Sequence, residues 1–187
     1  NAYEALAEGA GEIPAGAEGL VALPYFSGER TPLNDPDARG VIAGLTLSHS
    51  RAHVYRALLE SVALGVRHNL EEMGQSVQGG AGASSGSLVA IGGGAANEVW
   101  MQIVADVLGE GFTVRTSPGA PYGDAALAAV GTGVVAPGDI LEWVPAGKRV
   151  KPDPKNHEIY NRLYPLYRDL YNSSAKTLHL LAEMSRG

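Results

Sequence analysis

The chain has 187 residues, of which 45% are hydrophobic, so it is long enough to bury the core of one full domain. Its formal net charge of −6 argues against a nucleic-acid or an anionic-membrane partner, because both favour clustered Lys and Arg side chains. The absence of cysteine excludes disulfides and thiolate metal sites and fits a reducing compartment. We therefore expect a cytoplasmic protein that binds neither nucleic acid nor a membrane.

The first 45 residues predict a helix end, two short strands and a polar loop. Residues 1–18 are rich in Ala, Gly and Glu and predict the end of a helix with a connecting loop; because the sequence opens in mid-pattern, we expect it to be part of a longer protein. The apolar segments Gly19 to Phe26 and Gly40 to Leu45 predict strands. Charged residues crowd the loop at 27–39, where we expect local ion pairs worth at most about 1 kcal/mol each.

A long helix is predicted from about Ser50 to Met73, with Gly74 as its C-cap. Apolar residues recur at every fourth position and give one stripe: Val54, Leu58, Val62, Val66 and Leu70. The charged residues of this helix fall largely outside the stripe: Arg51, Arg56, Glu60, Arg67, Glu71 and Glu72. The Gly- and Ser-rich residues 75–87 predict a flexible surface loop.

The segment from Leu88 to Gly109 says most about function. A short apolar run meets the three consecutive glycines Gly92, Gly93 and Gly94, and an amphipathic helical pattern follows at once. A strand, a glycine turn and a helix N-terminus together place bare backbone where a nucleotide can approach it. This segment is therefore the candidate binding site.

The last third of the chain continues the alternation of strands and helices. Phe112 to Thr116 predicts a strand, Pro118 to Tyr122 a loop, and Gly123 to Gly133 a helix of small residues that can lie close to its neighbours. A final helix carries a tyrosine stripe that we interpret as a packing seam (Tyr160, Tyr164, Tyr167 and Tyr171), and Pro165 is expected to kink or restart it. The alternation predicts a layered α/β domain, and the five histidines show no metal-ligand spacing.

Three interpretations of the glycine turn stay open on the residues alone. It can be a purely structural strand-to-helix turn. It can be part of a dinucleotide fingerprint in an NADP-binding Rossmann-type oxidoreductase, with Asn97 in place of the third glycine and Arg115 placed for a 2′-phosphate. It can also be an adenosine site, in which the backbone of Gly92 to Ala95 packs against adenine and ribose and Asn97 holds the purine or the sugar. Asn97 also suits a helix N-cap.

A combination of motifs favours the adenosine site. Leu23 to Pro32 (LPYFSGERTP), Asp35 to Gly40 (DPDARG) and the stretch from Gly40 through Glu60 resemble the carboxy-terminal domain of the FGGY carbohydrate kinases. The glycine segment and the alanine-rich helix after it fit the same family, in the same order, over about residues 20–172. The SGERTP run is similar to the xylulokinase-like branch.

The resemblance implies an RNase H-like (actin-like ATPase) α/β fold, with a central mixed sheet flanked by helices. Residues 1–187 would form the C-terminal, nucleotide-binding domain without its first strands. The N-terminal sugar-binding domain, which would carry the catalytic Asp and most sugar contacts, would lie outside the chain. The chain alone would then be inactive, with neither a catalytic residue nor a metal ligand of its own.

The resemblance also implies the reaction and the cofactors. The whole enzyme would use ATP and Mg²⁺ to transfer the γ-phosphate to a hydroxyl of a ketose or polyol, with a xylulose-like pentulose favoured. The adenosine contacts of this chain would be Gly92, Gly93, Gly94, Ala95 and Asn97. The partner would be a small-molecule sugar, and the resemblance leaves room for a homodimer. A non-catalytic module on the same fold is the remaining alternative.

Overall fold

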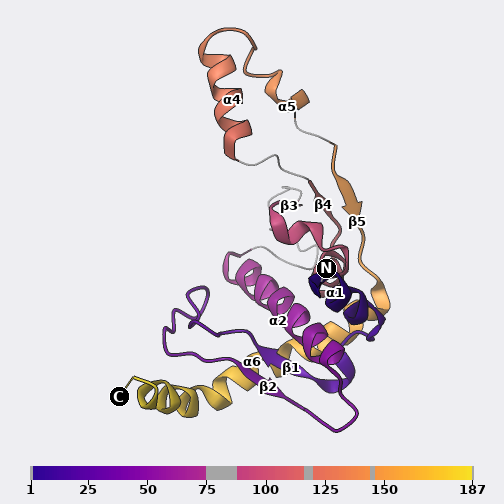
Figure 1. The fold of residues 1–187 in the computed structure, drawn as a ribbon, viewed down its shortest axis with the longest axis vertical. Coiled ribbons are helices and arrows are strands. Elements are labelled where there is room, and N and C mark those ends of the chain that lie inside the picture. Colours follow the sequence, from indigo (N-terminus) through magenta and orange to yellow (C-terminus); the bar gives the residue numbers. More distant parts are fainter. Residues whose placement is uncertain (1, 75–87, 116–119, 144–145, 187) are drawn as a thin grey trace.

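The structure is a computed structural model that describes residues 2–74, 88–115, 120–143 and 146–186 (Figure 1). Its helices are α1 (Ala2–Glu12), α2 (Arg51–Glu72), α3 (Glu98–Leu108), α4 (Ala120–Gly131), α5 (Ile140–Trp143) and α6 (Pro154–Met184). Its strands are β1 (Val21–Leu23), β2 (Val41–Ala43), β3 (Val89–Ala90), β4 (Phe112–Val114) and β5 (Lys148–Val150). The predicted elements are present in the expected order, with strands shorter than the sequence predicts, but α5 and β5 were not predicted. The expected loop at 75–87 lies outside the described residues.

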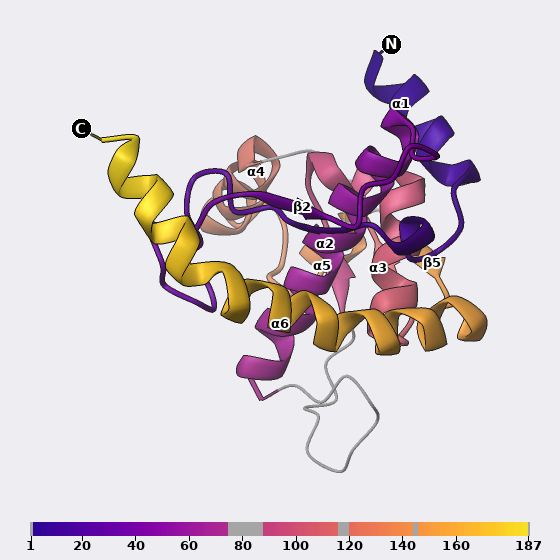
Figure 2. The same ribbon diagram turned by 90° about the horizontal axis from the view of Figure 1, so that it is seen from below.

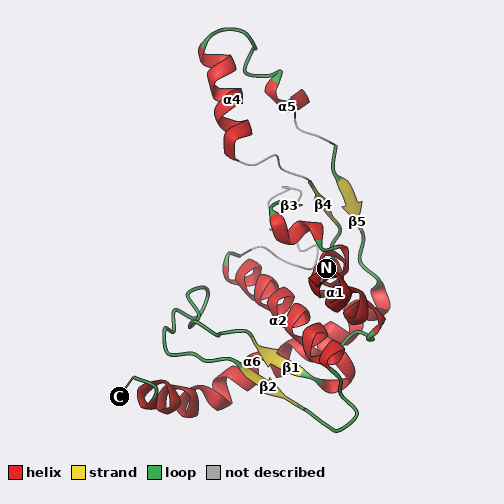
Figure 3. Ribbon diagram, in the orientation of Figure 1, coloured by secondary structure: helices red, strands yellow, loops and turns green. Residues whose placement is uncertain are grey.

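The described strands form two sheets, which Figure 3 shows in yellow. Strands β1 and β2 pair antiparallel, with Val21 opposite Ala43. Strand β4 lies between β3, which is parallel to it, and β5, which is antiparallel. The expected mixed α/β arrangement is therefore confirmed, although its strands are divided between two sheets.

The main core lies where α2, α3 and α6 meet β1. Helix α3 contributes a nearly continuous buried face, which includes Ile103, Val104 and Val107. Helix α6 crosses beneath the other elements in Figure 2, and it buries Tyr160, Tyr164 and Tyr167. The interpretation of the tyrosine stripe as a packing seam is confirmed.

Helix α2 begins and ends close to the predicted boundaries. The Ser50 side chain accepts a hydrogen bond from the Ala52 N–H, and Gly74 follows the helix with φ of +70°. The buried face, however, is not the predicted apolar stripe. Val62 is 40% exposed, whereas the charged residues Arg56 and Glu60 are 6% and 1% exposed. These two residues are buried because they pair with each other and with other elements.

One expectation for the later helices is wrong and another is wrong in part. The small-residue helix α4 begins at Ala120, inside the loop predicted for Pro118 to Tyr122, and it does not pack closely on the body: it extends away in Figure 1, with Leu127 72% exposed. Helix α6 runs from Pro154 to Met184 and does not restart at Pro165, whereas a kink at Pro165 stays a prediction. Pro165 is on the exposed side of the helix, where water can satisfy the carbonyl that the missing N–H leaves unpaired.

The charged loop between β1 and β2 is held by α6 as well as by local bonds. The Asp35 carboxylate accepts hydrogen bonds from Tyr171 Oη and His179 Nε2, both at 2.7 Å. Asp37 pairs with Arg186 at 2.8 Å. The expectation of purely local ion pairs is therefore wrong, because these partners come from the other end of the chain.

Candidate functional site

The glycine turn lies at the carboxyl end of β3 and leads into α3. Gly92 has φ of +97°, a left-handed conformation that favours glycine, and the 3-10 turn Gly93–Ala96 follows it. Strand β4 runs parallel to β3, so Arg115 lies at the same edge of the sheet, and its N–H donates to Ala90 O at 2.9 Å. Ligands of α/β sheets bind at this edge, outside the carboxyl ends of parallel strands.

The three glycines are in different surroundings. A Cβ atom on Gly92 or Gly93 would meet no atom of the described residues within 4 Å, and both glycines are exposed. A Cβ atom on Gly94 would lie 2.6 Å from the Trp100 ring. Gly94 is thus required by packing against Trp100, whereas Gly93 has no described neighbour that demands glycine.

Asn97 and Ala95 have structural roles in this turn. The Asn97 side chain caps α3 by accepting the Trp100 N–H at 3.0 Å, which confirms the N-cap interpretation. Ala95 is 9% exposed and packs into the main core. Only its backbone can face a ligand. The structure therefore brings all five predicted residues into one turn, and adenosine contact at each of them stays a prediction.

Charged side chains flank the turn. Glu98 at the start of α3 pairs with Lys148 of β5 at 2.6 Å, and this contact lowers the pKa of the Glu98 carboxyl. Arg115 Nε and Trp100 Nε1 are buried and have no hydrogen-bond partner among the described residues. Arg115 and Lys148 place cationic side chains at the edge of β4 and β5. This edge can therefore attract an anionic ligand although the net charge of the chain is negative.

A buried network that the sequence did not predict holds α2 against α6. Glu60 Oε1 accepts bonds from Arg56 Nε at 2.6 Å, from Tyr160 Oη at 2.9 Å and from the Gly16 N–H at 3.0 Å. Burial raises the pKa of the Glu60 carboxyl, against the hydrogen bonds and the charge of Arg56. Burial also raises the pKa of the Tyr160 hydroxyl, which therefore stays protonated and donates. The spacing of Arg56 and Glu60, four residues apart, was the available signal.

A second network ties α3 to the start of α6. The buried Asp106 carboxylate accepts bonds from the Asn156 amide at 2.8 Å, from the Asp153 N–H at 2.7 Å and from Gln102 Nε2 at 2.8 Å. Asp106 and Gln102 therefore support the helix that carries the glycine turn. Within the described ranges, no group of three or more His, Asp or Glu side chains is placed to hold a metal ion.

Comparison with known proteins identifies the family. Residues 1–132 match the model of the FGGY family of carbohydrate kinases, C-terminal domain. The chain is 33% identical to the xylulose kinase of Bacillus subtilis over 178 residues, and 34% identical to the ribulokinase of Bacillus licheniformis over 193 residues. These matches cover 90% and 98% of the chain but only 34% of each relative.

The fold agrees with this result. The crystal structure of xylulose kinase from Rhodospirillum rubrum superposes with a TM-score of 0.76 at 38% identity, covering 95% of this chain and 35% of that one. The chain thus spans about a third of the length of the relatives it matches. No helix in the described ranges combines the length and apolar character that crossing a bilayer requires. The chain belongs to the FGGY family of carbohydrate kinases and corresponds to their C-terminal domain.

Proposed function

We propose that this chain is the ATP-binding part of a sugar kinase that transfers the γ-phosphate of ATP to a hydroxyl of a ketose or polyol, with a xylulose-like pentulose as the favoured acceptor. The observation that carries the proposal is the glycine turn, whose backbone is open at Gly92 and Gly93 at the carboxyl edge of β3 and β4. Family membership supports it, because the similar proteins include a xylulose kinase and a ribulokinase.

The turn suits an adenosine group. A flat base and its ribose need a wall without side chains, and at Gly92 and Gly93 no described residue comes within 4 Å of where a side chain would begin. The Trp100 ring of α3 packs against Gly94 and so fixes the position of the turn relative to α3. Gly92 to Ala95 would thus form the floor of the site, and the amide group of Asn97 would add a polar contact at its edge.

The chemical step would need groups beyond those of the turn. Phosphoryl transfer depends on positioning the acceptor hydroxyl in line with the γ-phosphate and on neutralising the charge of the phosphates, which Mg²⁺ supplies when it is bound with ATP. We assign no catalytic residue to this chain, and we propose that a preceding sugar-binding domain provides the base and the sugar contacts. The contribution of this chain is to hold and orient the nucleotide.

A pair of glycine variants tests the nucleotide site. Neither Gly93 nor Gly138 has a positive φ, and a Cβ atom at either position would meet no described atom within 4 Å, so the two positions are matched sites for valine. We expect Gly93→Val in the purified protein to weaken MgATP binding at least tenfold with an unchanged unfolding midpoint, because the new side chain fills the space of the adenosine. Gly138→Val should leave both quantities unchanged. Equal MgATP affinity in the two variants would refute the proposal.

The reaction class needs a separate test. Thermal stabilisation of the purified protein by MgATP, and not by NADPH, is expected; stabilisation by NADPH alone would instead support a dinucleotide-binding oxidoreductase. ADP release by the full-length protein, in which the proposed sugar-binding domain is present, is then measured with D-xylulose, D-ribulose, gluconate and xylitol to identify the acceptor. Binding of MgATP by the full-length protein without ADP release in the presence of any of these acceptors would support the non-catalytic alternative.

A further inference from the structure

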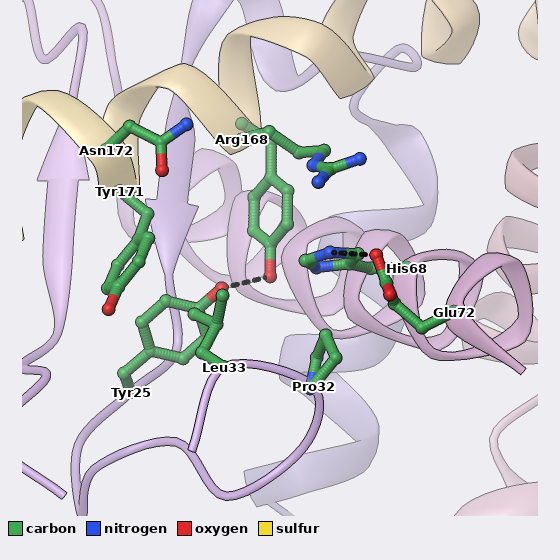
Figure 4. A pocket seen from close by; sticks show the side chains of 9 residues that line it. Tyr25, Pro32, Leu33, His68, Glu72, Arg168, Tyr171 and Asn172 are labelled. Carbon is green, nitrogen blue, oxygen red and sulfur yellow. Dashed lines mark hydrogen bonds and ion pairs between the residues drawn. The ribbon is translucent and has the colours of Figure 1, made fainter. Parts of the chain in front are cut away.

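A concave site lies between α2, α6 and the loop after β1. It has a volume of about 180 Å³ and is lined by nine residues (Figure 4): Tyr25, Pro32, Leu33, His68, Glu72, Tyr167, Arg168, Tyr171 and Asn172. A cavity of about 150 Å³ holds a molecule as large as benzene, so this pocket has room for a ligand of about six to ten heavy atoms. None of these residues belongs to the glycine turn.

The buried part of this pocket keeps unused hydrogen-bonding capacity. Tyr25 and Tyr167 are 3% and 2% exposed, and their hydroxyls lie 2.7 Å apart in one shared hydrogen bond (Figure 4). Two hydroxyls carry two protons and this bond uses one, so the other proton has no acceptor among the described residues. Burial raises the pKa of both hydroxyls, so both stay protonated. This pair, which lines the pocket, therefore keeps one donor for a ligand.

The walls add polar groups of both kinds. His68 is 5% exposed, and burial together with the charge of Arg168 lowers its pKa, so its imidazole is neutral and brings one donor and one acceptor. Its Nε2 lies 3.7 Å from Glu72. The side chains of Arg168 and Asn172 lie at the mouth, one helical turn apart on α6, and make no hydrogen bond to another described residue.

The charges of the lining select the class of ligand. The positive charge of Arg168 and the negative charge of Glu72 cancel, and His68 is neutral, so the lining of the pocket has no net charge. An anion would face the Glu72 carboxylate, and an alkyl group would leave the polar atoms of the floor and walls unpaired, which costs free energy. A molecule with a carbon face for the partly exposed Tyr171 ring and with several hydroxyls satisfies both requirements.

We propose that this pocket binds a small neutral polyol, with the Tyr171 ring against its carbon chain and with Arg168, Asn172 and His68 hydrogen-bonded to its hydroxyls. The site is separate from the nucleotide turn and does not depend on phosphoryl transfer. A polyol there would bridge α2, α6 and the loop after β1, and would hold these three elements together.

Two exposed residues on α6 allow a test that spares the fold. Xylitol is titrated into the purified protein, with saturation-transfer NMR to measure binding and thermal unfolding to confirm folding. We expect Asn172→Phe, which places a ring in the mouth of the pocket, and Arg168→Gln, which removes a donor, each to weaken xylitol binding at least fivefold. The matched controls are Ser173→Phe and Arg162→Gln, which make the same changes outside the pocket on the same helix.

The outcomes are exclusive. Loss of xylitol binding in both pocket variants, with binding retained in both controls, supports the proposal. Xylitol binding that is unchanged in the pocket variants overturns it, because the sugar is then held elsewhere, as in an acceptor site of the proposed kinase. Tighter binding of inorganic phosphate or of pentan-1-ol than of xylitol, sensitive to the same variants, also overturns it. Failure of the nucleotide test with Gly93→Val leaves this result unaffected.

Discussion

Replacing Glu60 with alanine should be among the most damaging single changes in this chain. Glu60 is 1% exposed and receives three hydrogen bonds on one oxygen, so its removal leaves the buried Arg56 guanidinium without its counter-charge. Breaking a buried ion pair in this way costs about 3–5 kcal/mol. For a chain of this length, that lowers the unfolding midpoint by about 10 °C. Glu60→Gln keeps the acceptor oxygen and loses only the charge, so we expect a smaller cost, about 1–2 kcal/mol.

Urea unfolding of the purified protein measures these differences as shifts of the midpoint at constant slope. Glu72→Ala is the matched control, because Glu72 lies on the same helix, is 56% exposed and should cost less than about 0.5 kcal/mol. If the network is buried as described, the loss of unfolding free energy is largest for Glu60→Ala, smaller for Glu60→Gln and smallest for Glu72→Ala. Equal costs for Glu60→Ala and Glu72→Ala would refute this account.

Three further changes test the turn and the loop. Gly94→Ala should cost about 1–3 kcal/mol because its Cβ would lie 2.6 Å from the Trp100 ring, whereas Gly93→Ala should change unfolding by less than about 0.5 kcal/mol; urea unfolding compares them. Asn97→Ala removes a cap and should cost about 1 kcal/mol in the same assay, with Asn97→Ser restoring most of it. Burial alone would raise the pKa of the Asp35 carboxyl, but the hydrogen bonds that it accepts lower this pKa below the ordinary value of 3.8. The carboxylate therefore stabilises the fold fully above about pH 4, and this stabilisation is lost as the pH falls through the lowered pKa. Asp35→Asn should reduce that acid sensitivity, and unchanged sensitivity would contradict the assignment.

Local signals were enough to predict the elements that carry the site. Ser50 and Gly74 mark the two ends of α2, and the apolar run before Gly92 predicts β3. These features could be predicted because caps, glycine turns and apolar runs depend on residues that are neighbours in the sequence. The N-cap role of Asn97 follows for the same reason. The five predicted site residues therefore lie together in the structure.

The errors arose where partners lie far apart in the sequence. Hydrophobic periodicity assigns charged residues to the surface, yet Arg56 and Glu60 are buried because Tyr160, about a hundred residues later, completes their hydrogen bonds. Helix α6 continues through Pro165, which lies on the exposed side of the helix, opposite the buried tyrosine stripe. The pocket between α2, α6 and the loop after β1 was missed because its residues come from three segments of the chain.

The tyrosine stripe of α6 has a role beyond apolar packing, because each ring ends in a hydroxyl that selects one partner. Four hydrogen bonds fix the register of the helix: Tyr160 to Glu60, Tyr164 to Glu71, Tyr167 with Tyr25, and Tyr171 to Asp35. A shift of α6 by one residue would break all four at once and leave buried polar atoms unpaired, which apolar rings alone would not penalise. The same helix holds Asp106 of α3 through Asn156. The position of the glycine turn, at the other end of α3, thus depends on the register of α6.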